Sequence, residues 1–153
     1  MDREIFAERV RRAQHQLYRI ACGQLRSPHD REDAVQEAIL KAWRMRFTLR
    51  NEAYFETWLI RILINECHNI QRSSKKCMPQ EKFHEEAYLP DEYADLREAV
   101  QRLDESLRLP VILHYIAGYD TKEAARILRI PHGTLCGRLK KARQHMKEFL
   151  KNA

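Results

Sequence analysis

Cationic side chains crowd the last predicted helix of this 153-residue chain, and their spacing suits contact with a polyanion. Residues 131–153 carry six basic side chains and one acidic side chain. Leu135, Leu139 and Ala142 recur at three- and four-residue spacing, which predicts the buried stripe of a helix. Arg138, Lys140, Lys141, Arg143 and Lys147 lie off that stripe. A helix face of this kind can bind phosphate groups.

A shorter helix and a tight turn are predicted just before it. Asp120 is a candidate N-cap, and Glu123 three residues later can complete a capping box. Because a residue before proline is disfavoured in the helical region, Pro131 separates the two helices, and the last helix should begin at or just after it. Two short helices joined by a tight turn, the second one cationic, predict a helix-turn-helix that enters the major groove of DNA.

The sequence contains no pattern that predicts catalysis or a bound cofactor. There is no ordered nucleophile and base, no glycine-rich phosphate loop and no metal motif. Cys22, Cys67, Cys77 and Cys136 lack a C-x-x-C spacing. His132 lies one helical turn from Cys136, but two ligands do not make a metal site. We therefore expect a protein that is not an enzyme and binds neither a cofactor nor a metal.

The chain also lacks a predicted membrane span. No apolar stretch of membrane length and no signal peptide is visible. We expect no membrane insertion and a cytoplasmic location, where thiols stay reduced.

The composition predicts an all-α protein with two modules. Long amphipathic segments, only four glycines and no alternating strand patterns favour helices with short connections. Net charge is +5 over residues 40–79, −6 over residues 80–106 and +5 over residues 131–153. Two positive blocks on either side of an acidic one predict two sites for a polyanion on separate modules.

Domain boundaries follow from where helical periodicity stops. Periodicity is absent from Cys77 to Tyr93, where Pro79 and Pro90 occur among acidic residues, as is typical of a linker. We expect two small helical domains, residues 1–76 and 93–153, joined by a flexible acidic linker at residues 77–92. The two could then sit at an adjustable distance on one duplex.

Three helices are predicted in the first domain. The first runs from Asp2 to about Leu25, as one long helix or two in tandem, with apolar positions recurring from Ile5 to Ala21. The second starts at Asp30 or a neighbour, and the third runs from an N-cap at Asn51 through about Ser73. In the second domain a helix is predicted from Asp91 to Ser106, with a stripe of Tyr93, Leu96, Val100 and Leu103, and a short helix opens at residues 109–113.

The loop before the third helix suits an unpaired base. Arg50, Asn51 and Tyr54 lie there, beside a basic helix. Stacking and hydrogen bonds to base edges are the means by which proteins hold single strands. Phe55 and Trp58 are expected to lie in the core instead.

Taken in order, these segments resemble an extracytoplasmic-function (ECF) sigma factor, a promoter-recognition subunit of bacterial RNA polymerase. The resemblance covers nearly the whole chain. Residues 18–19, 30–43 and 55–62 match the second conserved region of that family, and residues 103–119, 122–128 and 130–143 match the fourth.

The resemblance implies a function and its residues. It implies a non-enzymatic factor that directs core RNA polymerase to promoters, through contacts with the beta-prime clamp helices and the beta flap, and that melts promoter DNA. An anti-sigma factor is an expected further partner. Polymerase binding is implied for Asp33, Gln36, Glu37 and Leu40. Binding of the minus-ten element is implied for Arg50, Asn51, Glu52, Tyr54, Arg61 and Asn65. Binding of the minus-thirty-five element is implied for Thr134, Cys136, Gly137, Arg138, Lys140, Lys141 and Arg143.

The chain departs from the family pattern at several of these positions. Cys136 stands where Lys or Arg is common, and Gly137 stands where Ser is common. Arg129 replaces a glycine that is usual in the turn, and Asn51-Glu52 replaces Gly-Asp. A strong donor to guanine or phosphate is thus missing at Cys136, whose thiol would face DNA and could be sensitive to oxidation.

A second reading of the same features is a free-standing helix-turn-helix regulator whose N-terminal helices sense a ligand or form a dimer. The aromatic and basic third helix and the acidic linker favour the sigma factor, since a dimeric repressor needs no site for single strands.

Overall fold

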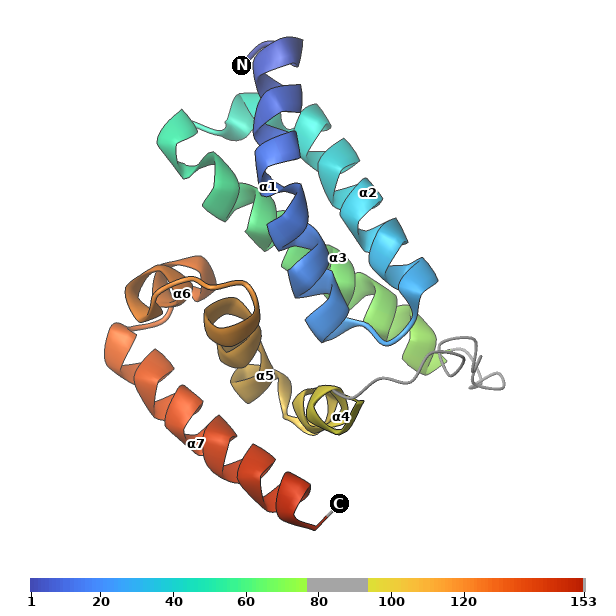
Figure 1. The fold of residues 1–153 in the computed structure, drawn as a ribbon. Helices are drawn as coiled ribbons and strands as arrows, with labels where there is room; N and C mark the ends of the chain where they lie inside the picture. Colours follow the sequence, from blue (N-terminus) through green and yellow to red (C-terminus); the bar gives the residue numbers. More distant parts are fainter. Residues whose placement is uncertain (77–93, 153) are drawn as a thin grey trace.

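The computed structural model describes residues 1–76 and 94–152, and every secondary-structure element in the described part is a helix or a helical turn, as predicted (Figure 1). Residues 77–92, where a flexible linker is predicted, fall outside the described residues. The N-terminal module packs three long helices side by side (Figure 1). Its elements are α1 (Arg3–Gln24), α2 (Pro28–Arg44), the 3-10 turns η1 (Arg46–Thr48) and η2 (Glu52–Tyr54), and α3 (Phe55–Lys76).

The C-terminal module consists of short helices and the long α7, which lies along its outer side (Figure 1). Its elements are α4 (Ala94–Arg102), α5 (Glu105–Val111), the π-helical turn η4 (Ile112–Ile116), α6 (Thr121–Leu128) and α7 (His132–Lys151). Helices α6 and α7 form the predicted helix-turn-helix. In the described residues no helix combines the length and apolar character that a membrane crossing requires.

Side-chain caps explain where several helices begin. The Asp120 carboxylate accepts a hydrogen bond of 2.7 Å from the backbone N–H of Glu123, which confirms the predicted N-cap of α6. Asp2 caps α1 in the same way through the N–H of Ile5, at 2.9 Å. Helix α7 starts directly after Pro131, as predicted.

Other predicted boundaries are wrong. Asn51 caps the 3-10 turn η2, through the N–H of Ala53 at 3.0 Å, and α3 begins only at Phe55. Helix α2 begins at Pro28, because Ser27 can cap it and proline is well suited to a first turn.

The predicted helix over residues 91–106 is in fact broken. Helix α4 ends at Arg102, and α5 starts at Glu105 after Asp104 as N-cap residue. Pro110 lies inside α5 rather than opening a helix, and the wider turn η4 follows it at once. Leu96 is 44% exposed and so does not belong to the buried stripe.

The turn between α6 and α7 carries local strain. Arg129 adopts φ 57° and ψ 43°, the left-handed region that favours glycine. A left-handed conformation costs an L-residue roughly 1–2 kcal/mol. The turn therefore keeps the geometry of the usual glycine while carrying an arginine.

The two modules share one continuous core. Leu17, Ile20, Leu59, Ile112 and Leu135 are almost fully buried members of a single apolar cluster that spans both modules. This contact differs from the picture of two separate units at an adjustable distance. In the structure of the free chain the modules lie directly against each other.

Candidate nucleic-acid interface

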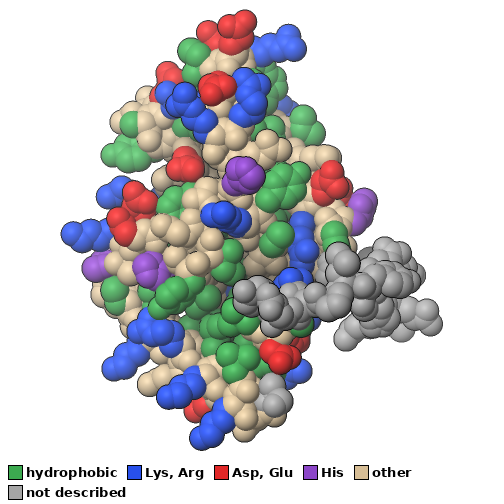
Figure 2. All heavy atoms as spheres, in the orientation of Figure 1, with side chains coloured by type: hydrophobic (Ala, Val, Ile, Leu, Met, Phe, Trp, Pro, Cys, Tyr) green, Lys and Arg blue, Asp and Glu red, His purple; other side chains and the backbone are tan. Residues whose placement is uncertain are grey.

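The outer face of α7 is open to solvent over the positions predicted to read DNA. Leu135, Leu139 and Ala142 are buried against the C-terminal module, as their spacing predicts. Arg138 is half-buried at one side of the exposed face. The remaining predicted positions are all exposed: Thr134, Cys136, Gly137, Lys140, Lys141 and Arg143. Figure 2 shows Lys and Arg side chains gathered in the lower part of the molecule, where α7 lies in Figure 1. The face is therefore cationic and reachable by a duplex.

Neighbouring side chains contact residues of this face at two places. The Arg143 guanidinium donates a hydrogen bond of 2.9 Å to the hydroxyl of Tyr115, which lies on η4. His132 Nε2 lies 2.7 Å from Thr121 Oγ1 and 3.5 Å from Cys136 Sγ. Among the described residues, no three metal-binding side chains come together. The sequence did not suggest Tyr115 as a partner of Arg143, because the two residues are far apart in the chain.

Gly137 gives a direct prediction about stability. A Cβ atom added at Gly137 would meet nothing within 4 Å, and its φ is not in the left-handed region. We expect Gly137→Ala to raise the free energy of unfolding by about 0.5–1 kcal/mol, because alanine loses less backbone entropy in a helix. Chemical denaturation of the variant and of wild type measures this difference in the free energy of unfolding.

Gly118 is the matched control for that prediction. It also has open space for a Cβ atom, but its φ is +84°. Gly118→Ala should lower the free energy of unfolding, since an L-residue is strained there. Equal changes in the free energy of unfolding for the two variants would contradict the prediction that backbone conformation decides the effect of each substitution.

The loop before α3 forms a second exposed site. Arg50, Asn51, Glu52 and Tyr54 all lie at the surface, and Tyr54 is 52% exposed. Arg9 of α1 pairs with the Glu52 carboxylate at 3.7 Å and also donates to the Glu52 backbone carbonyl. The loop is thus braced against α1 while the Tyr54 ring stays free for stacking.

The structure adds an aromatic group beside this loop that sequence reasoning missed. The Arg46 guanidinium lies 3.6 Å from the Trp43 ring centre and 4.2 Å from the Phe47 ring centre. Phe47 is 77% exposed. An arginine followed by an aromatic residue in a loop was the signal that could have marked it.

Helix α2 presents the four residues predicted to bind polymerase on one side. Asp33, Gln36, Glu37 and Leu40 are spaced at three and four residues, so they form one stripe. Asp33, Gln36 and Leu40 are exposed and Glu37 is half-buried. Leu40 is 54% exposed, and Glu37 pairs with Arg44 at 3.3 Å. The structure therefore leaves an apolar side chain in a polar stripe open to solvent.

Arg61 and Asn65, the other two residues predicted to bind the minus-ten element, differ in accessibility. Asn65 is exposed on α3. Arg61 is half-buried, and its guanidinium donates to the backbone carbonyls of Arg126 at 2.6 Å and Ile127 at 3.0 Å. Burial, followed by the charge of Arg129, lowers the pKa of Arg61, which nevertheless stays charged at neutral pH.

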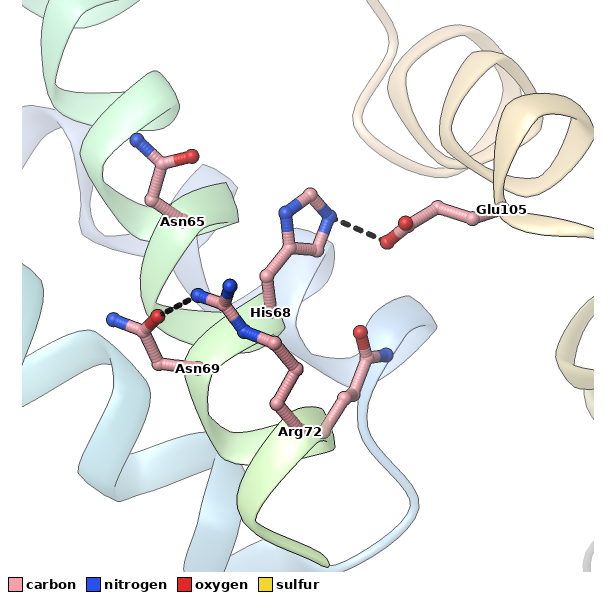
Figure 3. A pocket seen from close by; sticks show the side chains of 6 residues that line it. Asn65, His68, Asn69, Arg72 and Glu105 are labelled. Carbon is pink, nitrogen blue, oxygen red and sulfur yellow. Dashed lines mark hydrogen bonds and ion pairs between the residues drawn. The ribbon is translucent and has the colours of Figure 1, made fainter. Parts of the chain in front are cut away.

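A polar pocket lies further along the same helix, where α3 faces α5 (Figure 3). His68 Nε2 contacts the Glu105 carboxylate there, and Arg72 donates to the Asn69 side chain. The pocket is lined by Asn65, His68, Asn69, Gln71, Arg72 and Glu105.

The thiols differ sharply in their surroundings. Cys67 is buried, and this burial, with the nearby charge of Glu66, raises its thiol pKa to about 12. Cys22 and Cys136 are exposed. Because the thiolate is the reactive form, we expect Cys67 to resist alkylation between pH 7 and pH 9 in the folded chain.

Mass spectrometry after iodoacetamide treatment tests this expectation. Cys22 and Cys136 should be modified in the native chain, and Cys67 only after denaturation. Modification of Cys67 at a rate similar to that of Cys136 would contradict the burial described here.

The chain thus combines a helix-turn-helix that has a cationic outer face with a three-helix module that has an exposed aromatic loop. Residues 9–77 match sigma-70 region 2, and residues 93–146 match sigma-70 region 4. The chain belongs to the ECF sigma factor family of RNA polymerase. It is a transcription initiation factor and not an enzyme, and a free-standing helix-turn-helix regulator is not favoured.

Individual relatives support this assignment over most of the chain. The ECF RNA polymerase sigma factor SigM of Mycobacterium tuberculosis is 32% identical over 97% of this chain and 79% of the relative. The ECF RNA polymerase sigma-E factor of Escherichia coli is 30% identical over 94% of this chain and 85% of the relative.

Solved structures show the same fold. CnrH, in complex with the cytosolic domain of CnrY, matches with a TM-score of 0.81 at 23% identity, over 99% of this chain and 90% of that chain. The sigma factor RpoE from Bartonella quintana, in complex with the anti-sigma factor NepR, matches with a TM-score of 0.79 at 23% identity, over 97% of this chain and 98% of that chain.

Proposed function

We propose that three surfaces divide the work of promoter recognition in this chain. The stripe on α2 binds the beta-prime clamp helices of core RNA polymerase. The loop before α3, with Arg61 and Asn65, binds the minus-ten element. The outer face of α7 binds the minus-thirty-five element as duplex, and the C-terminal module also contacts the beta flap. Residues 1–76 and 93–153 act as the two functional domains.

One observation supports this proposal above the others. A cationic helix with its face open to solvent belongs to one module, and an exposed tyrosine in a braced loop belongs to the other. Duplex binding needs the first arrangement, and binding of an unpaired base needs the second. A repressor that binds only duplex has no use for the loop.

Melting would then proceed by base capture. Extruding a base costs a few kcal/mol of lost stacking and pairing. Stacking on an aromatic ring returns about 1–3 kcal/mol per base, and hydrogen bonds from Asn51 and Arg50 to the base edge add to it. In this loop, Tyr54 supplies the aromatic ring for such stacking.

Base capture can be observed with a promoter selected from a randomised library by the wild-type holoenzyme. 2-Aminopurine replaces each base of the minus-ten element in turn, and its fluorescence rises when the base leaves the stack. We expect Tyr54→Ala to reduce that rise about tenfold, because one stacking partner is lost. Tyr54→Phe keeps the ring and should retain most of it. Equal signals from Tyr54→Ala and wild type would refute the role of Tyr54.

Partners beyond polymerase follow from the relatives. CnrH and RpoE are seen in complexes with CnrY and with the anti-sigma factor NepR. We propose that an anti-sigma protein likewise binds this chain in the cytoplasm, where the polymerase works. The chain needs no cofactor for this function.

A further inference from the structure

We propose that Tyr115 and Arg143 form a phosphate clamp on one flank of α7, in which the Tyr115 hydroxyl orients the Arg143 guanidinium and donates its own proton to the same phosphate. Tyr115 thereby joins the surface that binds the minus-thirty-five duplex, although it lies on η4 and outside the helix-turn-helix. This inference rests on the proposed function, because it adds a residue to the DNA-binding face of α7.

The two side chains meet at the surface of the C-terminal module. Arg143 Nη1 donates a hydrogen bond of 2.9 Å to the Tyr115 hydroxyl oxygen. Arg143 is exposed, and Tyr115 is 54% exposed. Because the hydroxyl oxygen accepts this bond, the hydroxyl can donate its own proton to another acceptor, and a guanidinium has further N–H donors in its fork. An arginine fork and an adjacent hydroxyl can together bind two oxygens of one phosphate.

Arg143 lies on a side of α7 that meets the DNA backbone when the helix is in the groove. An α-helix with its side chains is about 10–12 Å across, and the major groove is about 12 Å wide. Side chains on the flanks of such a helix therefore reach the phosphates that border the groove. Arg143 is seven residues after Cys136, close to two full turns, so the two residues share one flank.

That flank offers DNA only weak or engaged donors nearer the start of α7. The exposed thiol of Cys136 is a weak donor. His132, one turn before Cys136, has its Nε2 atom 2.7 Å from Thr121 Oγ1. The clamp supplies this flank with a charged phosphate contact about two turns farther along the helix.

The surroundings of Tyr115 fix the position of its ring. The π-helical turn η4 is closed by a hydrogen bond of 2.8 Å from the Ala117 N–H to the Ile112 carbonyl. The His114 ring packs edge-on against the Tyr115 ring at 4.8 Å between centroids, and His114 Nδ1 lies 2.7 Å from the Tyr119 carbonyl. Single π-helical turns are frequent at functional sites, and a ring held in place loses little conformational entropy on binding.

A purely structural role for the bond is the alternative. Buried Leu135, Leu139 and Ala142 already fasten α7 to its module. A hydrogen bond between two exposed side chains adds little to such packing, because water competes for both partners. We therefore expect the loss of the Tyr115 hydroxyl to change DNA binding far more than it changes the free energy of unfolding.

The experiment measures binding of the full chain to the minus-thirty-five duplex of the selected promoter. The variants are Tyr115→Phe, which keeps the ring, Arg143→Ala and the two combined. Tyr18→Phe is the matched control, because it removes a hydroxyl from half-buried Tyr18 on α1 of the other module. Each phosphate of the duplex is replaced in turn by an uncharged methylphosphonate, and chemical denaturation gives the free energy of unfolding of each variant.

We expect Tyr115→Phe to bind the natural duplex about tenfold more weakly than wild type, because it loses a hydrogen bond to a charged group. Arg143→Ala should also make the slope of log affinity against log salt shallower by about 1, whereas Tyr115→Phe removes no charge and should leave that slope unchanged. Tyr18→Phe should match wild type.

The methylphosphonate series identifies the clamped phosphate. Neutralising that one phosphate should cost the wild-type chain about tenfold in affinity and the combined variant less than about twofold, because both of its protein partners are already absent. Phosphates bound by other cations of α7 should stay sensitive in every variant.

An affinity of Tyr115→Phe within about twofold of wild type would overturn the clamp, and so would a methylphosphonate profile that is the same for wild type and the combined variant. A loss of affinity explained by a lower free energy of unfolding would overturn it in favour of the structural role. In these cases α7 remains the DNA-binding face. Failure of the wild-type chain to bind the duplex would contradict the proposed function itself, and the clamp with it.

Discussion

Alanine at both Gln36 and Leu40 is expected to weaken binding of core RNA polymerase by about 100-fold, or roughly 3 kcal/mol. Leu40 is an apolar side chain held 54% exposed among polar neighbours on α2. Burial of such a side chain by a partner contributes strongly to the free energy of binding. Replacing Gln36 by alanine would also remove a hydrogen bond to polymerase that the complex shields from water. Fluorescence anisotropy of the labelled chain with purified core enzyme measures the affinity.

The matched control removes two exposed side chains from a different helix. Gln14 and His15 are both exposed on α1. Gln14→Ala with His15→Ala should leave polymerase affinity within about twofold of wild type, and both double variants should bind the minus-thirty-five duplex normally. Unchanged polymerase binding by the Gln36 and Leu40 variant would show that α2 is not the docking surface.

Alanine at both Arg138 and Lys141 is expected to weaken minus-thirty-five duplex binding by about 30-fold at low salt. Each cation that neutralises a phosphate releases counterions, so the slope of log affinity against log salt should become shallower by about 2. Arg138 is half-buried, whereas Lys141 is exposed.

Lys147 and Lys151 provide the control for charge alone. Both lie on α7 and are exposed, but they follow the segment that would enter the groove. Lys147→Ala with Lys151→Ala removes the same two charges and should cost less than about threefold. Equal losses for the two double variants would indicate general attraction to DNA rather than a reading face on the first turns of α7.

Local signals predicted the helix-turn-helix well. The cap at Asp120, the break at Pro131 and the buried spacing of Leu135 and Leu139 are properties of neighbouring residues, and the structure shows all of them. The predicted start of α3 at Asn51 was wrong because Asn51 caps a single 3-10 turn instead. A cap residue predicts that a helix begins, but not which kind of helix.

Contacts distant in sequence could not be predicted in this way. The fit of Ile112 against Gly23 and the bond from Arg61 to α6 join residues that only the fold brings together. Nothing in the spacing of Arg61 distinguishes a DNA-binding arginine from one that binds a helix end. The closed arrangement of the modules therefore emerged only with the structure.

The division of labour between the modules is tested most directly by potassium permanganate footprinting of a promoter selected with the wild-type holoenzyme. Unpaired thymines in the minus-ten region should become reactive when core polymerase and this chain are present together, and should stay unreactive with either one alone. Protection of every thymine in the complete mixture, under conditions where the chain demonstrably binds core polymerase, would contradict the account.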